Sequence, residues 1–423
     1  MTTSSTARDV VWPCVDLGGT SLRLLMVRPA ARAYGGEVVV RLEERTPRGL
    51  EGLLQALRAT LQRGREQAQQ LGCRVVPALA LGTPGRYQRG PDGRRRIAPY
   101  SATSLEDHPG EFHDLDLLAA LSQSLEMPED CLFVDNDAVV QGLALVQQLL
   151  EGSARASYLG ERVVCINPGT GLGGCVAEVS ADGEVQVFTD GHVSEISLHP
   201  LTHGGSVGEL QVHLTTTADA SSLWLHVDDG ENTRELSLAT PAGKQAEDLI
   251  AGTGVARIVA GLDRLLGLDA EQGPLQRAAA QLGLGPRSLG GPLVSRCLEF
   301  NPTTPEQELA RDAAIWIADL TAAALLKLMH VLRDGTPRKT PRFDTWPAAD
   351  VERIRGVRRF VIGGGIARHS LGGHMVQVAQ EAWASAAKEV TVHAPDQSGD
   401  AGALGALFLV SPVRRLELEA LAS

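Results

Sequence analysis

The spacing of hydrophobic and polar residues predicts alternating strands and helices in the first third of the chain. Apolar residues alternate with polar ones at 22, 24 and 26, as in a half-buried strand, and recur at helical spacing over 50–71. In order, we expect a strand on each side of residues 16–20, a strand at 38–42, a helix at 50–71, a strand at 75–81, a helix at about 115–125, a strand at 132–134 and a helix at 138–150. This alternation predicts the α/β class, with a mixed sheet covered by helices.

The same order of elements begins again in the second third of the chain. An apolar run at 163–166 leads into a glycine-rich turn at 169–174, and alternating residues follow at 176–179. This recurrence indicates an internal duplication. Further along, we expect a strand-rich segment at 206–242, helices at 245–265, 274–282 and 310–332, a loop at 334–350, a strand at 358–362 and a terminal helix from 401.

Composition and charge narrow the class of protein. The 423 residues are 43% hydrophobic and 21% charged, which suggests two or three globular domains. We find no run of ~20 apolar residues and no apolar signal core near the start, so we expect a cytoplasmic protein with no membrane segment. The six cysteines are scattered, which argues against zinc ribbons and disulfide frameworks. The net charge of −12 argues against a nucleic-acid partner.

Residues able to carry chemistry gather where predicted strands end. The first such segment is Asp16-Leu17-Gly18-Gly19-Thr20. Glycines at a tight turn can adopt positive φ and expose backbone N–H groups, which makes a small anion-binding concavity. Asp16 would then hold a divalent cation, through water, beside a bound phosphate. The simpler alternative is a hairpin whose glycines serve only the turn.

Three similar segments follow at later strand ends. Asn136-Asp137 comes after the strand at 132–134, and glycine-rich stretches at 169–174 and 363–365 follow two further apolar runs. Asn136-Asp137 has a structural alternative, because Asn-Asp before a helix is also a good N-cap. Their order along one chain, more than any one of them, indicates a function.

Taken together, these segments resemble the sugar-kinase branch of the actin, heat-shock ATPase and hexokinase superfamily, and within it the ROK family and the bacterial glucokinases. In chain order, 15–20 looks like the first phosphate motif, 134–138 like the catalytic Asn-Asp-Ala step, 167–173 like the second phosphate motif, 247–252 like the Glu-x-x-x-Ser-Gly segment, 360–366 like the adenosine motif, and 399–406 like the terminal glycine and alanine motif. The resemblance spans nearly the whole chain. It implies two RNase H-like lobes, each a duplicated mixed sheet with helices, around an interdomain cleft. We expect a small lobe at 8–145 that recovers about 400–423, and a large lobe at 146–399.

The resemblance also implies a reaction, which is ATP-dependent phosphorylation of a hexose, with glucose to glucose 6-phosphate as the first choice. Asp137 would act as general base, Asn136 would orient the sugar, and Asp16 would organise Mg²⁺. The expected phosphate- and ATP-binding residues are Asp16, Gly18, Gly19, Thr20, Gly169, Thr170, Gly171, Gly363, Gly364 and Gly365. Backbone N–H groups from two glycine hairpins would position the triphosphate and stabilise the charge on the transferred group.

The sugar ligands are less sharply defined, because the chain departs from the family pattern there. The family's Glu-x-Gly-His matches Glu195 and His199 with one extra residue, or it matches His192 with Thr189 in place of the glutamate. We prefer Glu195 and His199, together with Glu247 and Ser101, as further sugar contacts. The cysteine-rich zinc loop of many relatives is missing, so we expect no structural zinc. A homodimer is the family habit.

Other interpretations fit the sequence less well. Residues 169–174 satisfy G-x-G-x-x-G, but a dinucleotide site must open a helix and a strand follows here. Residues 204–208 satisfy the hydrolase nucleophile pattern, but no buried strand precedes them. The remaining alternatives are a kinase of fructose, mannose or an N-acetylhexosamine, and a non-catalytic sugar-binding pseudokinase or regulator. The presence of Asp137 favours catalysis.

Overall fold

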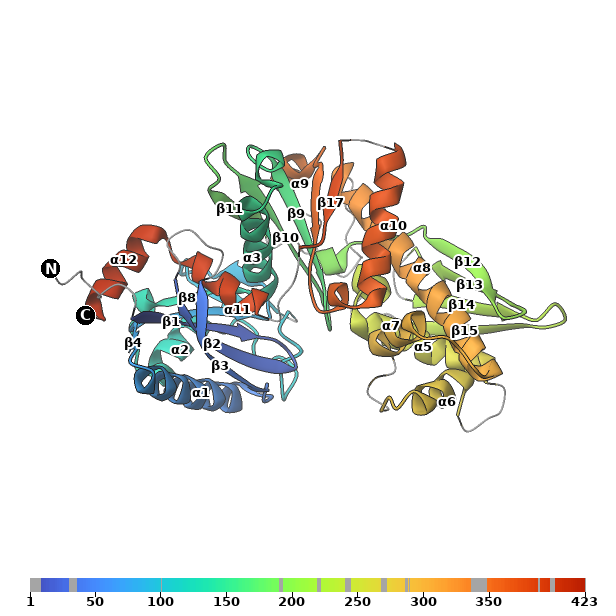
Figure 1. The fold of residues 1–423 in the computed structure, drawn as a ribbon, viewed down its shortest axis with the longest axis horizontal. Coiled ribbons are helices and arrows are strands. Elements are labelled where there is room, and N and C mark those ends of the chain that lie inside the picture. The colour runs from blue at the N-terminus through green and yellow to red at the C-terminus, as the bar shows by residue number, and fades with distance from the viewer. Residues whose placement is uncertain are drawn as a thin grey trace. The chain divides into compact units, whose positions relative to one another are not determined.

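The computed structural model divides into two compact units (Figure 1). The first unit comprises residues 1–159, 179–190 and 396–423, and the second unit comprises 160–178 and 191–395. The structure describes residues 9–29, 36–99, 101–189, 193–218, 222–239, 245–267, 272–285, 288, 290–335, 348–386, 389–395 and 400–422.

A mixed sheet forms the centre of the first unit. Its strands run in the order β3 (Glu37–Arg45), β2 (Ser21–Arg28), β1 (Val10–Leu17), β5 (Leu79–Thr83) and β8 (Leu132–Asn136), with β4 (Arg74–Val75) beside the start of β1. The first three strands are antiparallel, whereas β5 and β8 run parallel to β1. The carboxyl ends of β1, β5 and β8 therefore meet at one edge of the sheet.

Helices cover both faces of this sheet (Figure 1). Gly64 of α1 (Leu50–Gln70) lies against Leu24 and Met26 on one face, and Gly402 of α11 (Ala401–Ala406) lies against Asp16 on the other. Because both faces are covered, β1 is buried along nearly its whole length. The unit also contains the hairpin β6 (Tyr87–Arg89) and β7 (Arg95–Ile97), helices α2 (Leu117–Leu125), α3 (Asp137–Glu151) and α12 (Pro412–Leu421), strand β11 (Val185–Thr189), and the 3-10 turns η1 (Glu129–Cys131), η2 (Arg155–Ser157) and η7 (Leu407–Leu409).

The second unit repeats the central pairing pattern of the first. Strands β10 (Leu172–Val179) and β9 (Arg162–Pro168) form an antiparallel hairpin, and β16 (Arg359–Ile362) and β17 (Thr391–His393) continue from β9 in parallel. The order β10-β9-β16-β17 matches β2-β1-β5-β8 of the first unit. The fold class expected from the sequence, with a duplicated mixed sheet, is confirmed.

The strand-rich segment expected around 206–242 is a separate antiparallel meander. It consists of β12 (Thr202–Val207), β13 (Leu210–Thr216), β14 (Ser222–Asp228) and β15 (Thr233–Ala239). Alternate residues such as Val212, Leu214 and Leu225 are buried, and the meander packs on α5 (Gly252–Leu266) and α8 (Pro305–Arg333).

The helix expected at 245–265 is two helices, because the chain turns at Ala251. Ala251 has extended backbone angles and separates α4 (Gln245–Ile250) from α5. The turn is tight, since a Cβ atom on Gly254 would lie 2.1 Å from the Asp248 carbonyl oxygen. The other helices of the second unit are η3 (Val193–Glu195), α6 (Pro274–Gln281), α7 (Gly291–Glu299), α9 (Ala348–Ile354), η6 (Ile366–Arg368) and α10 (Ser370–Ala386).

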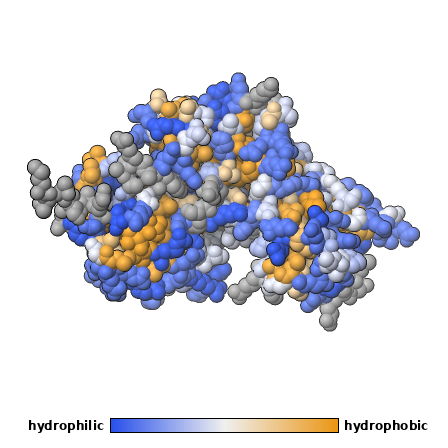
Figure 2. Space-filling model, in the orientation of Figure 1, coloured by the Kyte–Doolittle hydropathy of each residue, from blue (hydrophilic) through white to orange (hydrophobic). Residues whose placement is uncertain are grey.

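Among the described helices, α8 is the one long and apolar enough to cross a membrane by length and composition. It has 29 residues, and its most apolar window has a mean hydropathy of 1.6 and is 61% buried within the chain. It packs against α4, α5, α6, α7 and α10, as the core helix of a globular domain does. The visible surface is mostly hydrophilic, with separate hydrophobic patches (Figure 2).

Candidate active site

Two carboxylates lie at the carboxyl edge of the first unit's sheet. Asp16 is near the end of β1, and Asp137 is the first residue of α3, directly after β8. Strand β5 lies between them, with Gly82 paired to both Asp16 and Asp135. Neighbouring strands are about 4.8 Å apart, so two strand spacings, about 10 Å, separate the backbones of Asp16 and Asp135. The edge of an α/β sheet where parallel strands end is the usual place for a ligand site.

Asp137 is held in a state suited to proton transfer. Burial, together with the negative charge of Asp16, raises its pKa from 3.8 to about 7, against the opposing effect of the Ala138 backbone N–H. That N–H donates to Asp137 Oδ1 at 2.8 Å. A carboxylate with a pKa near 7 is both available as a base and strong enough to take a proton from a hydroxyl.

Asn136 has a structural role that its position in the sequence also allowed. Its Oδ1 caps α3 by accepting the backbone N–H of Ala138 at 3.0 Å, and its Nδ2 donates to the Gly85 carbonyl at 2.8 Å. Both ends of the amide are therefore engaged within the first unit. The effect is to fix the loop at Gly85 and the first turn of α3, which carries Asp137.

Hydrogen bonds at Gly18 close the turn between β1 and β2. The Gly18 N–H donates to the Ser21 carbonyl at 2.8 Å, and the Thr46 hydroxyl donates to the Gly18 carbonyl at 2.7 Å. The expectation of positive φ is wrong here, because neither Gly18 nor Gly19 adopts it. Glycine is needed at position 19 for space, since a Cβ atom there would lie 2.7 Å from the Ser104 Cβ. Thr20, next in the turn, is exposed.

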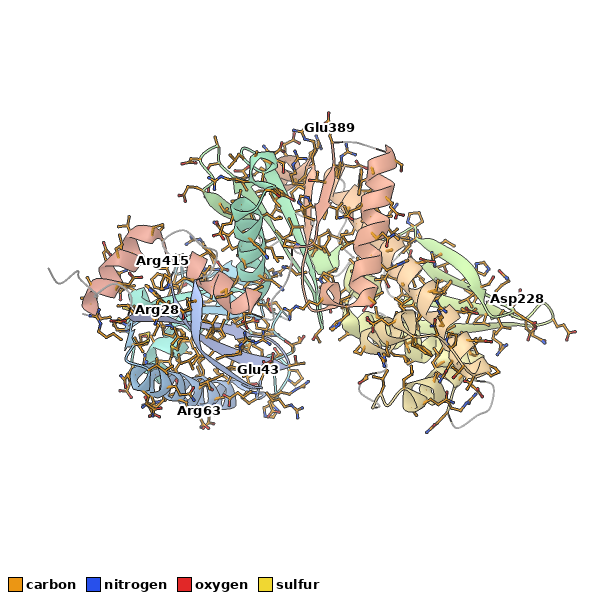
Figure 3. The ribbon with its side chains drawn as sticks, in the orientation of Figure 1. Arg28, Glu43, Arg63, Asp228, Glu389 and Arg415 are labelled. Carbon is orange, nitrogen blue, oxygen red and sulfur yellow. The ribbon has the colours of Figure 1, made fainter. Side chains whose placement is uncertain are left out.

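A row of charged residues crosses three strands beside Asp16. Asp16 on β1 pairs with Arg23 on β2, which pairs with Glu43 on β3. Arg23 contacts Glu43 at 2.8 Å and Asp16 at 3.7 Å, and Glu43 is labelled on β3 in Figure 3. On the same face, a Cβ atom on Gly402 would lie 2.5 Å from the Asp16 Cγ, so only glycine lets α11 approach so closely. Asp16 is thus held from two directions.

Ser101 lies in the loop that follows β7. Its hydroxyl donates to the Ala98 carbonyl at 2.6 Å and accepts the Arg86 backbone N–H at 3.0 Å. These bonds fix the loop beside Gly85, and they engage the hydroxyl that we expected to contact a sugar.

The second unit has its own glycine turn, at 169–171. The Gly169 N–H donates to the Gly171 carbonyl at 2.8 Å and closes the turn between β9 and β10. The first N–H groups of α5 donate back to it, from Gly252 to the Gly169 carbonyl at 2.8 Å and from Thr253 to the Thr170 carbonyl at 3.1 Å. The turn and the start of α5 therefore form one rigid piece.

The glycines at 363–365, which we expected to hold adenosine, lie against the end of β9, next to the same turn. The Gly363 N–H donates to the Ile166 carbonyl at 2.8 Å. Gly364 has a φ of 81°, and a Cβ atom on it would lie 2.3 Å from the Pro168 carbonyl oxygen. Segments almost 200 residues apart in the sequence are thus in contact at the end of the second unit's sheet.

We expect Gly364→Ala to destabilise the protein, lowering the free energy of unfolding by at least ~2 kcal/mol, because alanine disfavours positive φ and its Cβ would overlap Pro168. Urea unfolding measures the effect. Gly365→Ala is the matched control, since φ at Gly365 is −63° and a Cβ atom there meets nothing within 4 Å. Equal stability of the two variants would contradict the contact described here.

Glu247 brings a carboxylate to the glycine turn. It lies on α4, and its Oε2 accepts the Leu172 backbone N–H at 3.3 Å and lies 3.4 Å from where a Gly171 Cβ would be. A carboxylate repels phosphate but accepts hydrogen bonds from sugar hydroxyls. Glu247 therefore suits a sugar better than the triphosphate itself.

The segment expected to hold the sugar is only partly described. His192 lies outside the described residues, and Glu195 is placed by its backbone at the end of η3. His199 is exposed, and its Nδ1–H donates to the Thr216 carbonyl at 3.0 Å. Gln245 is fully buried and ties this segment to α4, because its Oε1 accepts the Leu198 N–H at 2.7 Å.

The chain was compared with known protein families, curated proteins and solved structures, and only the solved structures gave matches. No protein-family model matches the chain, and no curated protein matches its sequence. A ROK family glucokinase from Streptomyces griseus, solved with glucose and AMPPNP, is 19% identical and has a TM-score of 0.52 over 94% of this chain and 98% of its own. A ROK hexokinase from Thermus thermophilus is 18% identical, with a TM-score of 0.50 over 97% and 99%. The glucokinase of Balamuthia mandrillaris, solved with glucose, is 15% identical, with a TM-score of 0.51 over 96% and 94%.

The chain has the fold of the ROK-family sugar kinases. The family resemblance drawn from the sequence is confirmed at the level of the fold. Within this fold, residues 16–20 and Asp137 lie at one end of the first sheet, and the glycine-rich segments 169–171 and 363–365 lie at the corresponding end of the second.

Sequence reasoning missed three residues that position this site, namely Arg23, Gly402 and Gln245. A signal for Arg23 was available, because the hairpin turn at 18–20 fixes the register that places position 23 opposite Asp16. Gly402 lies in the terminal motif at 399–406, but its contact with Asp16 joins distant segments and could not be assigned from that motif. The role of Gln245 also depends on a contact between distant segments, and nothing local in the sequence marks it.

Proposed function

We propose that this chain is an ATP-dependent hexose kinase that transfers the γ-phosphoryl group of ATP to the primary hydroxyl of a sugar, with glucose as the first candidate. The observation that carries the proposal is Asp137, a partly buried carboxylate at the carboxyl edge of a parallel sheet with its pKa raised to about 7. The ROK fold and the six motifs in family order support it.

In this mechanism Asp137 accepts the proton of the attacking sugar hydroxyl. The hydroxyl oxygen then forms a bond to the γ-phosphorus, and the bond from that phosphorus to the β,γ-bridging oxygen breaks, which leaves ADP. Asn136 keeps Asp137 in place by capping α3. Glu247, His199, Glu195 and Ser101 remain our candidates for holding the sugar hydroxyls.

The glycine turn of each unit is proposed to hold phosphate through its backbone N–H groups, and residues 363–365 are proposed to hold the adenosine. Mg²⁺ fits the first unit, because Asp16 offers a partly exposed carboxylate. Asp400, whose charge acts on the same Arg23 as that of Asp16, has a buried Oδ1 with no hydrogen-bond partner among the described residues. Bound Mg²⁺ would neutralise phosphate charge during transfer. Asp16 would hold it through water.

The pKa of Asp137 sets the pH dependence that we expect. Only the ionised carboxylate can accept a proton, so kcat/KM for the sugar should fall about tenfold per pH unit below about pH 7 and level off above it. Steady-state rates from pH 5.5 to 9 at saturating Mg-ATP test this. The residual rate of Asp137→Asn should not show this dependence, and a flat profile for the parent enzyme would remove Asp137 from the base role.

The proposed function is tested by coupled ADP release with Mg-ATP against glucose, mannose, fructose, N-acetylglucosamine and N-acetylmannosamine, with Asp137→Asn beside the parent protein. Sugar-dependent turnover that the substitution abolishes would support the kinase and identify its substrate. Sugar binding without turnover, with ATP and with other phosphoryl donors, would favour the pseudokinase instead.

A substitution decides between the two alignments of the sugar segment. If Glu195 binds the sugar, Glu195→Gln should raise the sugar KM at least fivefold and leave the ATP KM within twofold, because a hydrogen bond to a charged group is worth about 1.5–3 kcal/mol. An unchanged sugar KM would favour the alternative at His192.

We propose the lobes expected from the sequence, 8–145 with about 400–423 and 146–399, as the functional division. We also propose a cytoplasmic location and a homodimer. Sedimentation velocity tests the oligomeric state.

A further inference from the structure

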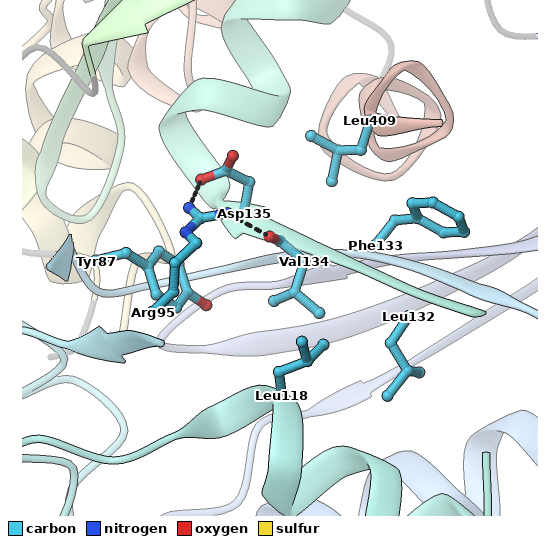
Figure 4. Close-up of a pocket in the computed structure, with 8 residues that line it drawn as sticks. All are labelled: Tyr87, Arg95, Leu118, Leu132, Phe133, Val134, Asp135 and Leu409. Carbon is cyan, nitrogen blue, oxygen red and sulfur yellow. Dashed lines mark hydrogen bonds and ion pairs between the residues drawn. The ribbon is translucent and has the colours of Figure 1, made fainter. Parts of the chain in front are cut away.

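A pocket of about 260 Å³ lies at the outer edge of β8 (Figure 4), and its lining includes Val134 and Asp135, which precede Asn136 and Asp137 on the same strand and helix start. Its walls come from the β6–β7 hairpin, α2, β8 and η7. Most of its lining residues are apolar: Leu118, Leu132 and Val134 lie on one side of β8, and Phe133 and Leu409 lie on the other. Tyr87 and Arg95 supply the polar groups on the hairpin side.

The Tyr87 hydroxyl is buried and has no hydrogen-bond partner among the described residues. Burial, and to a lesser extent the charge of Asp135, raises the pKa of Tyr87, so the phenol stays protonated at any physiological pH. A buried donor without a partner carries a free-energy cost of about 1–3 kcal/mol, which a ligand with an acceptor would relieve.

Arg95 places positive charge in the same part of the pocket. Its guanidinium lies over the Tyr87 ring, 4.6 Å from the ring centroid. It donates to Asp135 Oδ1 at 2.7 Å and to the Val134 carbonyl at 3.3 Å. A guanidinium has five N–H donors, so these two bonds leave donors for a further acceptor.

We propose that this pocket binds a small monocarboxylate with an apolar body, and that its occupancy weakens sugar binding at the neighbouring active site. The leucine and valine walls take the apolar body, while Tyr87 O–H and Arg95 hold the carboxylate. A free sugar would leave its hydroxyls unpaired against these walls. A dianionic phosphate would be repelled by Asp135 more strongly than a monocarboxylate, because the ion pair with Asp135 already offsets part of the Arg95 charge.

The coupling to the active site runs through Asp135. Its Oδ1 accepts from Arg95 and also from the Asn136 backbone N–H, at 2.8 Å. A ligand carboxylate competes with Asp135 for Arg95 and so weakens the Arg95–Asp135 ion pair. Asp135 in turn holds the backbone of Asn136, the residue that caps α3 and positions Asp137. This second part rests on the proposed kinase function, whereas binding itself does not.

Isothermal titration of the full-length protein with 3-phenylpropanoate tests the site. We expect saturable binding that weakens at least tenfold in Leu118→Trp, which fills the pocket, and in Tyr87→Phe, which removes the unpaired hydroxyl. Arg89→Gln is the matched control, because Arg89 lies opposite Arg95 in the same hairpin and, among the described residues, donates to the Gly93 carbonyl. This variant should bind like the parent. The neutral analogue 3-phenylpropanamide should bind at least fivefold more weakly.

Absence of binding at millimolar concentration, or binding that Leu118→Trp and Tyr87→Phe both leave unchanged, would overturn the site. In kinetics, saturating 3-phenylpropanoate should raise the sugar KM at least twofold in the parent and not in Leu118→Trp. Binding with an unchanged sugar KM would overturn the coupling alone. Failure of the kinase proposal would appear as no turnover with any sugar while the titrations still give their result.

Discussion

Asp137→Asn should lower kcat by about 10³-fold while the Kd for the sugar stays within about threefold of the parent value. General-base catalysis contributes about 10²–10⁴-fold, and asparagine cannot accept the proton. The substitution keeps the size of the side chain and the cap from Asn136, so the sugar site should keep its shape. Coupled ADP release measures kcat, and isothermal titration measures sugar binding.

Asp116→Asn is the matched control for this effect. Asp116 also lies at the start of a helix in the first unit, where it caps α2 by accepting the Ala119 N–H at 3.0 Å, and asparagine caps equally well. Its kcat should stay within twofold of the parent. A normal rate in Asp137→Asn would assign the proton transfer to another group.

Gly402→Ala should lower kcat/KM for Mg-ATP by about 10²-fold without unfolding the protein. The added Cβ would lie 2.5 Å from the Asp16 Cγ, so Asp16 or α11 must shift, and displacement by about 1 Å is enough for a loss of this size. Steady-state kinetics with varied Mg-ATP measures the loss, and circular dichroism checks the fold.

Gly52→Ala in α1 controls for the loss of a glycine, because its Cβ would make an ordinary contact with Pro47 at 3.6 Å. Its kinetics should match the parent. Parent-like kinetics in Gly402→Ala would show that the position of Asp16 does not limit the reaction and would weaken its assignment to Mg²⁺.

The elements with a clear hydrophobic period could be predicted from the sequence. Helix α1 begins and ends within one residue of the range inferred from its leucines, and α8 contains the expected 310–332. The duplication was visible because each half opens with a strand, a glycine turn and a second strand. These are local patterns, and local patterns survive in a single sequence.

Contacts between distant segments could not be predicted in this way. Gly19 suggested a positive φ, but glycine is required there because a larger residue would collide with Ser104. Ser104 lies 85 positions away, and nothing in the sequence around it indicates the contact. The break between α4 and α5 at Ala251 comes from hydrogen bonds to the distant residues Gly169 and Thr170. The sequence itself keeps a helical period across Ala251 and therefore does not show the break. Asn136 fitted both a capping and a binding role, and only the structure shows that its amide is engaged at both ends.

The raised pKa of Asp137 also means that this residue lowers the stability of the folded protein at neutral and alkaline pH. The folded state holds the proton up to about pH 7, whereas the unfolded chain releases it near pH 3.8, so the free energy of unfolding falls as pH rises between these values. Above pH 7 the ionised side chain lowers the free energy of unfolding, and a neutral asparagine at this position would remove that cost. A selection for heat-resistant variants at alkaline pH would therefore enrich inactive proteins changed at position 137, unless growth on the sugar is selected at the same time.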